Sequence, residues 1–69
     1  MTVYVLHDCD DWLERHYIAG VFSSREKAIA YITECYPKYA HVERYDQWEN
    51  DDTGYLYISE HKLDAGDGE

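Results

Sequence analysis

Basic residues are scarce in this sequence. Six Lys and Arg stand against 15 Asp and Glu, so the formal net charge is −9. A protein that binds nucleic acid by neutralising phosphates needs a surplus of Lys and Arg. The composition therefore argues against direct nucleic-acid binding.

Long apolar runs and a basic leader are also missing. No stretch approaches the roughly 20 apolar residues of a membrane helix. Residues 1–7 lack the basic opening of a secretory signal. We therefore expect no membrane association and a cytoplasmic location, where Cys9 and Cys35 would remain free thiols.

The length of 69 residues is sufficient for one core and no more. Such a chain buries only about 60% of its unfolded surface, which leaves little room for a deep catalytic cleft. We expect a single domain over residues 1–63 and a frayed acidic tail over residues 64–69, because the tail has no large apolar residue to anchor it.

Four segments have the composition of strands. Residues 3–6 and 16–22 are β-branched and aromatic, and Gly20 suggests a bulge in the second of them. Residues 41–48 form a less regular strand candidate. Residues 55–59 form the strongest one, and the turn signal of residues 50–54 predicts a hairpin that joins the last two.

One helix is expected between the second and third strands. The hydroxyl of Ser23 precedes the carboxylate of Glu26 by three residues, which is the capping-box spacing of a helix start. Pro37 predicts an end near Cys35 or Tyr36. The order β-β-α-β-β indicates an α+β fold in which an antiparallel sheet of about four strands carries one helix on one face.

Three segments carry a resemblance to a known family. Residues 4–7 (YVLH), 20–28 (GVFSSREKA) and 57–64 (YISEHKLD) resemble a family of small, uncharacterised bacterial and phage proteins. The resemblance implies two strands, a capped helix and a closing strand, and no activity. The acidic segment 41–54 does not align with the family pattern.

No catalytic, cofactor or metal motif is evident. His7 and Cys9 are the best metal candidates, yet no paired ligand spacing follows them. A calcium loop beginning at Asp8 would need Gly and Glu where Leu13 and Ala19 stand. Cys9 has acidic neighbours, which should raise its thiol pKa and lower its reactivity. We expect no enzyme, no cofactor and no metal.

The acidic residues gather around the two tryptophans. Carboxylates surround Trp12 in one predicted loop and Trp48 in another. Acidic turns also keep small proteins soluble. The more specific hypothesis is that both loops bind a basic protein surface, with the carboxylates steering the encounter and the aromatic rings anchoring it. The candidate partner-binding residues are Asp8, Asp10, Asp11, Trp12, Glu14, Asp46, Trp48, Glu49, Asp51 and Asp52.

These features favour a small acidic protein-binding module. A charge of −9 equals that of about 15 Å of duplex DNA. The specific expectation is therefore a phage-type inhibitor, acting as a DNA mimic or steric blocker, of a basic nucleic-acid-handling protein such as a host defence nuclease complex. The alternative is a homodimeric structural or regulatory domain that pairs through a Tyr-rich sheet face, drawn from Tyr4, Tyr17, Tyr45, Tyr55 and Tyr57.

Overall fold

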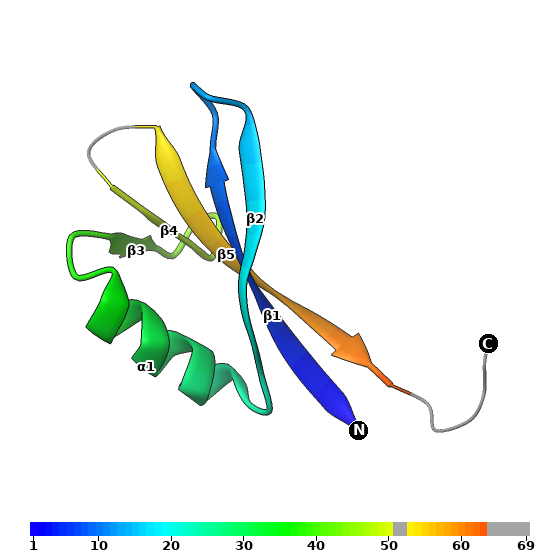
Figure 1. Ribbon diagram of the computed structural model, residues 1–69. Coiled ribbons are helices and arrows are strands. Elements are labelled where there is room, and N and C mark those ends of the chain that lie inside the picture. The colour runs from blue at the N-terminus through cyan, green and yellow to red at the C-terminus, as the bar shows by residue number, and fades with distance from the viewer. Residues whose placement is uncertain (51–52, 64–69) are drawn as a thin grey trace.

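The computed structural model describes residues 1–50 and 53–63 and shows an antiparallel sheet with a helix on one side (Figure 1). The elements in chain order are β1 (Thr2–Asp10), β2 (Arg15–Phe22), α1 (Arg25–Cys35), β3 (Ala40–Val42), β4 (Gln47–Glu49) and β5 (Gly54–Lys62). The strands lie in the order β2-β1-β5-β4-β3, and all neighbours are antiparallel. The α+β class is confirmed, with five strands in the described residues rather than about four.

The additional strand arises where a single strand over residues 41–48 was predicted. That segment turns back on itself, because the carbonyl of Val42 accepts a hydrogen bond from the amide of Tyr45 and that of Glu43 accepts one from Asp46. Asp46 takes a positive φ of 52°, which Asp tolerates better than most residues. The apolar residues of the segment recur every three positions rather than every two, which is the sign of this break.

The helix begins and ends where the sequence predicts. Ser24 is the N-cap, and its side chain accepts a hydrogen bond from the amide of Lys27. The capping residue is therefore Ser24 rather than the expected Ser23, one position further along the chain. At the other end, the amide of Tyr36 donates to the carbonyl of Ile32, and Pro37 follows.

A bulge confirms the irregularity expected near Gly20. The pairing of β1 with β2 changes from Leu6 opposite Gly20 to His7 opposite Ile18, which leaves Ala19 as the extra residue. A side chain at Gly20 would come within 2.8 Å of the ring of Phe22. Glycine therefore allows the ring to lie against the strand.

The core lies between α1 and the middle of the sheet. Leu6 of β1 and Leu56 of β5 are fully buried, Ile32 of α1 is 1% exposed, and Trp48 of β4 joins them at 7%. Each fully buried aliphatic side chain contributes roughly 1.5–3 kcal/mol to folding. This cluster holds the helix on one face of the sheet.

No helix of the described residues covers the opposite face of the sheet (Figure 1). Side chains alternate along each strand, so the neighbours of Leu6 and Leu56 point away from α1. We call this the open face. By this alternation its members include Val5, His7, Cys9, His16, Ile18, Val21, Gln47, Glu49, Tyr55, Tyr57, Ser59 and His61.

Several expectations fall on residues that the structure does not describe. Asp51, Asp52 and the acidic tail of residues 64–69 lie outside the described ranges. Within those ranges, no helix is long and apolar enough to cross a membrane.

We predict that Ile32→Ala lowers the free energy of unfolding by about 2–5 kcal/mol, because it leaves a cavity between α1 and the sheet. Urea denaturation followed by circular dichroism measures this loss. Ile18→Ala is the matched control, since Ile18 is 57% exposed, and its cost should stay below about 1 kcal/mol. Equal losses in the two variants would contradict the position of the core.

Candidate protein-binding site at the acidic end of the sheet

Asp10 organises the turn between β1 and β2. One oxygen of its carboxylate accepts hydrogen bonds from the amides of Trp12 (3.0 Å) and Leu13 (3.1 Å) and from the hydroxyl of Thr53 (2.7 Å). The bond from Thr53, followed by the bond from the Leu13 amide, lowers the pKa of Asp10. The ionised carboxylate is therefore a structural part of the turn.

The bond to Thr53 also joins the two acidic loops. The amide of Asp11 donates to the carbonyl of Thr53, and the amide of Asn50 donates to the carbonyl of Gly54. Gly54 lies opposite Asp10 in the register of β1 and β5. The turn around Trp12 and the described ends of the connection between β4 and β5, at Asn50 and Thr53, thus lie at one end of the sheet, which we call the acidic end.

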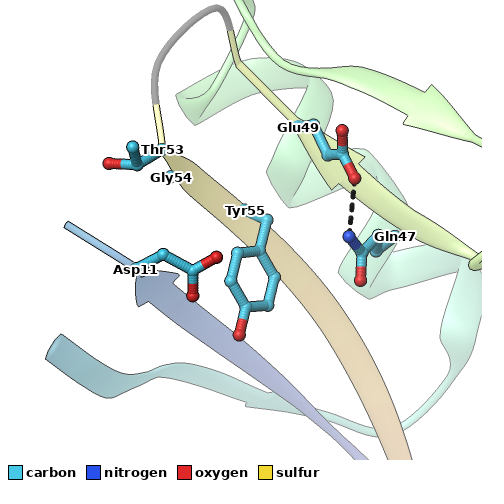
Figure 2. Close-up of a pocket in the computed structure, with 6 residues that line it drawn as sticks. All are labelled: Asp11, Gln47, Glu49, Thr53, Gly54 and Tyr55. Atoms are coloured by element: carbon cyan, nitrogen blue, oxygen red, sulfur yellow. Dashed lines mark hydrogen bonds between the residues drawn. The ribbon is translucent and has the colours of Figure 1, made fainter. Parts of the chain in front are cut away.

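A hollow of about 520 Å³ opens at the acidic end. Its described lining residues are Asp11, Gln47, Glu49, Thr53, Gly54 and Tyr55. Figure 2 shows the ring of Tyr55 between Asp11 on one side and Gln47 with Glu49 on the other. The amide of Gln47 donates a 2.6 Å hydrogen bond to Glu49 and orients that carboxylate.

The two tryptophans have opposite environments. Trp12 is 79% exposed in the β1–β2 turn and follows Asp11, which lines the hollow. Trp48 belongs to the core, and its ring packs beside that of His41 with centroids 4.6 Å apart. The expectation that Trp48 anchors a partner is corrected by this placement, since its side chain faces α1.

Two of the candidate carboxylates lie away from the acidic end. Asp8 points to the helix side and accepts a hydrogen bond from the hydroxyl of Tyr36 at 3.1 Å. Burial, together with the charge of Asp8, raises the pKa of Tyr36 to about 12.

Asp46 lies in the turn between β3 and β4. One oxygen accepts a 2.7 Å hydrogen bond from the guanidinium of Arg25 and lies 3.0 Å from Nε2 of His41. The hydrogen bond with His41, followed by the charge of Arg25, lowers the pKa of Asp46. This carboxylate already has cationic or hydrogen-bonding neighbours within the chain.

The candidate partner-binding residues predicted from the sequence thus have different roles in the structure. Asp10, Asp11, Trp12, Glu14 and Glu49 gather at the acidic end, whereas Asp8, Asp46 and Trp48 stabilise the fold. Thr53 and Tyr55 also belong to the acidic end, although neither was among the candidate residues for a basic partner and Tyr55 was assigned to the Tyr-rich face of the homodimer alternative. The pairing of Tyr55 with Glu49 follows from the predicted hairpin, which is the one signal that could have found Tyr55.

The cysteine thiols and the potential metal ligands of the described residues show no arrangement for chemistry. Burial raises the pKa of the Cys9 thiol, and the charges of Asp8 and Asp11 act in the same direction against a hydrogen bond from Tyr55. The raised pKa of Cys9 agrees with the direction expected from the sequence, although burial is a larger cause than the acidic neighbours. Cys9 and Cys35 are both free thiols. Residues 1–50 and 53–63 contain no group of three or more His, Cys, Asp or Glu arranged for a metal ion.

Fold and site together define a small α+β domain of five antiparallel strands and one helix, with acidic residues around a hollow at one end. The chain belongs to the family described as Domain of unknown function (DUF7336), which covers residues 1–64. This agrees with a family of uncharacterised proteins. No curated protein and no solved structure matches the chain.

We predict that Asp10 makes the order of the β1–β2 turn depend on pH. Because the folded-state pKa of Asp10 lies below its ordinary value of 3.8, its contribution is complete above that value and is lost as the pH falls through the lowered pKa. Hydrogen exchange at the amides of Trp12 and Leu13 measures this.

Asp10→Ala should speed that exchange severalfold at neutral pH, because both amides lose their acceptor. Asp10→Asn is the matched control, since its side-chain oxygen still accepts hydrogen bonds but does not titrate. Exchange in the Asn variant should be close to the wild type at neutral pH and should lack the acidic step. An unchanged acidic step in this variant would contradict the role of Asp10.

Proposed function

We propose that the protein is a non-enzymatic module that binds, through its acidic end, a protein with a basic surface. The observation that carries the proposal is the hollow that Asp11 of the β1–β2 turn and Glu49 of β4 line together, with the exposed Trp12 next to Asp11 in the chain. A dispersed acidic surface would keep the chain soluble without producing such a feature.

The hollow has the chemistry of a receptor for a cationic side chain. Asp11 and Glu49 supply carboxylates, which form the stronger, charge-assisted hydrogen bonds with Arg and Lys. The ring of Tyr55 offers a face for a cation–π contact. An Arg side chain of the partner can use both interactions at once, because its planar guanidinium donates to carboxylates and stacks on rings.

Trp12 supplies exposed apolar contact area in the β1–β2 turn, directly after Asp11 in the chain. Its side chain is 79% exposed, and Leu13 is 49% exposed on the same turn. Binding energy in protein interfaces concentrates in aromatic residues and Arg, surrounded by contacts that exclude water. We therefore assign anchoring to Trp12 and charge recognition to Asp11 and Glu49.

The net charge of −9 supports a partner with a basic surface. A negative field increases the rate of encounter with a basic surface and repels nucleic acid. Proteins that handle nucleic acid carry such basic surfaces. We propose a partner of this class, and an inhibitor of phage type, acting as a DNA mimic or a steric blocker of a defence nuclease complex, as the specific role.

The three nucleophiles that the sequence analysis and the helix start bring forward, Ser23, Ser24 and Cys9, support a role without catalysis. Ser24 caps α1, the hydroxyl of Ser23 accepts a hydrogen bond from the ammonium group of Lys27, and Cys9 is buried. None of these side chains lines the hollow.

We predict that removing the two carboxylates of the hollow weakens partner binding. The proteins captured from a host lysate on the wild-type chain are purified, and their affinities for the Asp11→Asn/Glu49→Gln variant are measured by calorimetry. The Glu26→Gln/Glu34→Gln variant is the matched control, because it removes the same charge from α1. We expect a loss of tenfold or more for the first pair, about 1.4 kcal/mol, and less than threefold for the second.

A competition assay tests the inhibitor role. The wild-type chain should displace duplex DNA from the captured protein, and the Asp11→Asn/Glu49→Gln variant should fail to do so at the same concentration. Equal displacement of DNA by the wild type and by the variant would show that the hollow does not bind the partner. A captured protein with no affinity for nucleic acid would refute the inhibitor role.

A second candidate function is self-association through the open face. Among its described members, Glu49 is the one carboxylate, although the chain is strongly acidic. Ile18 and Val21 on this face are 57% and 59% exposed. Two copies of an acidic chain can approach through such a face with little repulsion. The face is richer in His than in Tyr, because alternation turns Tyr4 and Tyr17 toward the helix side.

For this candidate, light scattering at two concentrations should show a dimer that Val21→Glu converts to a monomer. Tyr45→Glu is the control, because Tyr45 is 60% exposed in the β3–β4 turn, away from the open face. A monomer at both concentrations would eliminate the candidate.

A further inference from the structure

Three histidines and a serine are joined by hydrogen bonds on the open face. Nδ1 of His7 lies 2.8 Å from Nε2 of His16, and Nε2 of His7 lies 2.7 Å from the hydroxyl of Ser59. The same hydroxyl lies 2.9 Å from Nε2 of His61. The four side chains come from the adjacent strands β2, β1 and β5, and we call them the histidine network.

His7 is the central ring of the histidine network. The ring of Tyr57 stacks on it, with centroids 4.2 Å apart and planes inclined by 7°. His7 is half-buried, whereas His16 and His61 are exposed. Because both nitrogens of His7 have partners, a proton that either neighbour gains must be accommodated at His7.

The titratable groups that face His7 come from three strands. They are His16 of β2, Cys9 of β1, and Tyr55, Tyr57 and His61 of β5. Burial raises the pKa of Cys9 and that of Tyr55, which keeps both groups uncharged at neutral pH. The helix α1 lies on the other face of the sheet and adds no group to this surface (Figure 1).

Charged side chains lie apart from the histidine network. Glu49 of β4 is the one carboxylate among the described members of the open face, and the hydrogen bond from Gln47 orients it at the acidic end. Asp8 and Arg15 point to the helix side by strand alternation. Within the described residues, His41 is the histidine that lies against a carboxylate. A proton on the histidine network therefore has no carboxylate in contact with it.

Neutral rings satisfy every hydrogen bond of the network. In one arrangement, Nε2 of His16 donates to His7, Nε2 of His7 donates to Ser59, and the serine hydroxyl donates to His61. The reverse arrangement is equally complete, since a neutral imidazole has one donor and one acceptor. In both arrangements a single hydrogen lies between His7 and His16.

The first added proton leaves the contact between His7 and His16 intact. A charged His7 donates from Nδ1 to the neutral ring of His16 and from Nε2 to Ser59, and such charge-assisted bonds are the stronger ones. A second proton on the pair has the opposite effect. Both facing nitrogens then carry a hydrogen and neither can accept, so the 2.8 Å hydrogen bond is lost.

We propose that the contact between His7 and His16 is a pH switch of the open face, which is closed with up to one added proton on the pair and opens with the second. Ser59 and Tyr57 hold His7 in place, whereas His16 is exposed on the edge strand β2. His16 is therefore the ring that turns into solvent. Once His61 is protonated as well, the open face carries three positive rings that were neutral before.

The environment of His7 sets the pH at which the switch opens. Burial, followed by the charges of His16 and His61, lowers the pKa of His7 from its ordinary value of 6.5. The second proton therefore enters the pair below that value. Because the two rings interact, the two steps belong to the pair and not to either residue alone.

The switch has a consequence for self-association through the open face, and this consequence rests on the second candidate function. Near neutral pH the rings are uncharged, and two copies approach through this face without repulsion between them. In acid, three cationic rings on each copy oppose that contact, because like charges across an interface repel. A dimer formed through this face should dissociate as the second proton enters.

Nuclear magnetic resonance of the untagged, ¹⁵N-labelled full chain tests the switch between about pH 8 and about pH 4. The shifts of the ring nitrogens should show His7 and His16 titrating in two steps, separated by about one pH unit or more. Cross-relaxation between the two rings, whose centroids lie 5.0 Å apart, should disappear at the second step.

His16→Ala removes one of the charges that lower the pKa of His7. In this variant His7 should titrate in a single step, at a higher pH than the second step of the wild type. His41→Ala is the matched control, because His41 bonds to Asp46 on a different part of the fold, and it should retain both steps. Circular dichroism should show that both variants fold.

Either of two results would overturn the switch. The first is a titration of His7 at the same pH in His16→Ala as in the wild type, which would show that the rings are not coupled. The second is cross-relaxation between His7 and His16 that survives below the second step, because the contact would then not open.

Light scattering at both ends of the titration separates the switch from self-association. A monomer at both pH values would refute the second candidate function, while the ring titration, measured within one chain, would still decide the switch. A dimer that persists in acid would overturn the link between the switch and self-association.

Discussion

The register between β1 and β5 is the constraint on which the other features depend. It places Leu6 and Leu56 together under α1, and it places Asp10 opposite Gly54 so that the two acidic loops meet. It also brings Ser59 to His7 on the open face. A shift of one residue would turn each of these side chains to the other face of the sheet. The core, the acidic end and the hydrogen bond between His7 and Ser59 therefore depend on the same register.

The sheet separates three kinds of chemistry. Apolar side chains face α1, carboxylates gather at one end, and the open face carries histidines with little fixed charge. This separation follows from the single helix, which covers one face and leaves the other exposed. Carboxylates that lie far from the acidic end have local partners, as Asp46 does with Arg25 and His41. An acidic surface and a face with little fixed charge can thus coexist on one small domain.

Local patterns were sufficient to predict most elements. The helix from Arg25 to Cys35 was visible in its cap and in Pro37, and the bulge beside Gly20 was visible in the glycine itself. The segment of residues 41–48 was mistaken for one strand, because its turn depends on Asp46, which bonds to Arg25 of α1. Trp48 looked like a surface residue because its neighbours in the chain are acidic, whereas its place in the core depends on contacts with the distant Leu6 and Ile32.

The sequence by itself determined the class of fold, the helix limits, the negative charge and the presence of two aromatic-centred acidic segments. These properties depend on composition and on residues a few positions apart. Only the tertiary structure decided which carboxylates share a site and which tryptophan is exposed. It also decided that hydrogen bonds link the side chains of His7, His16, Ser59 and His61. The reason is that these groups lie up to 54 positions apart in sequence, His7 and His61 being the most distant pair. Strand pairing alone brings them together.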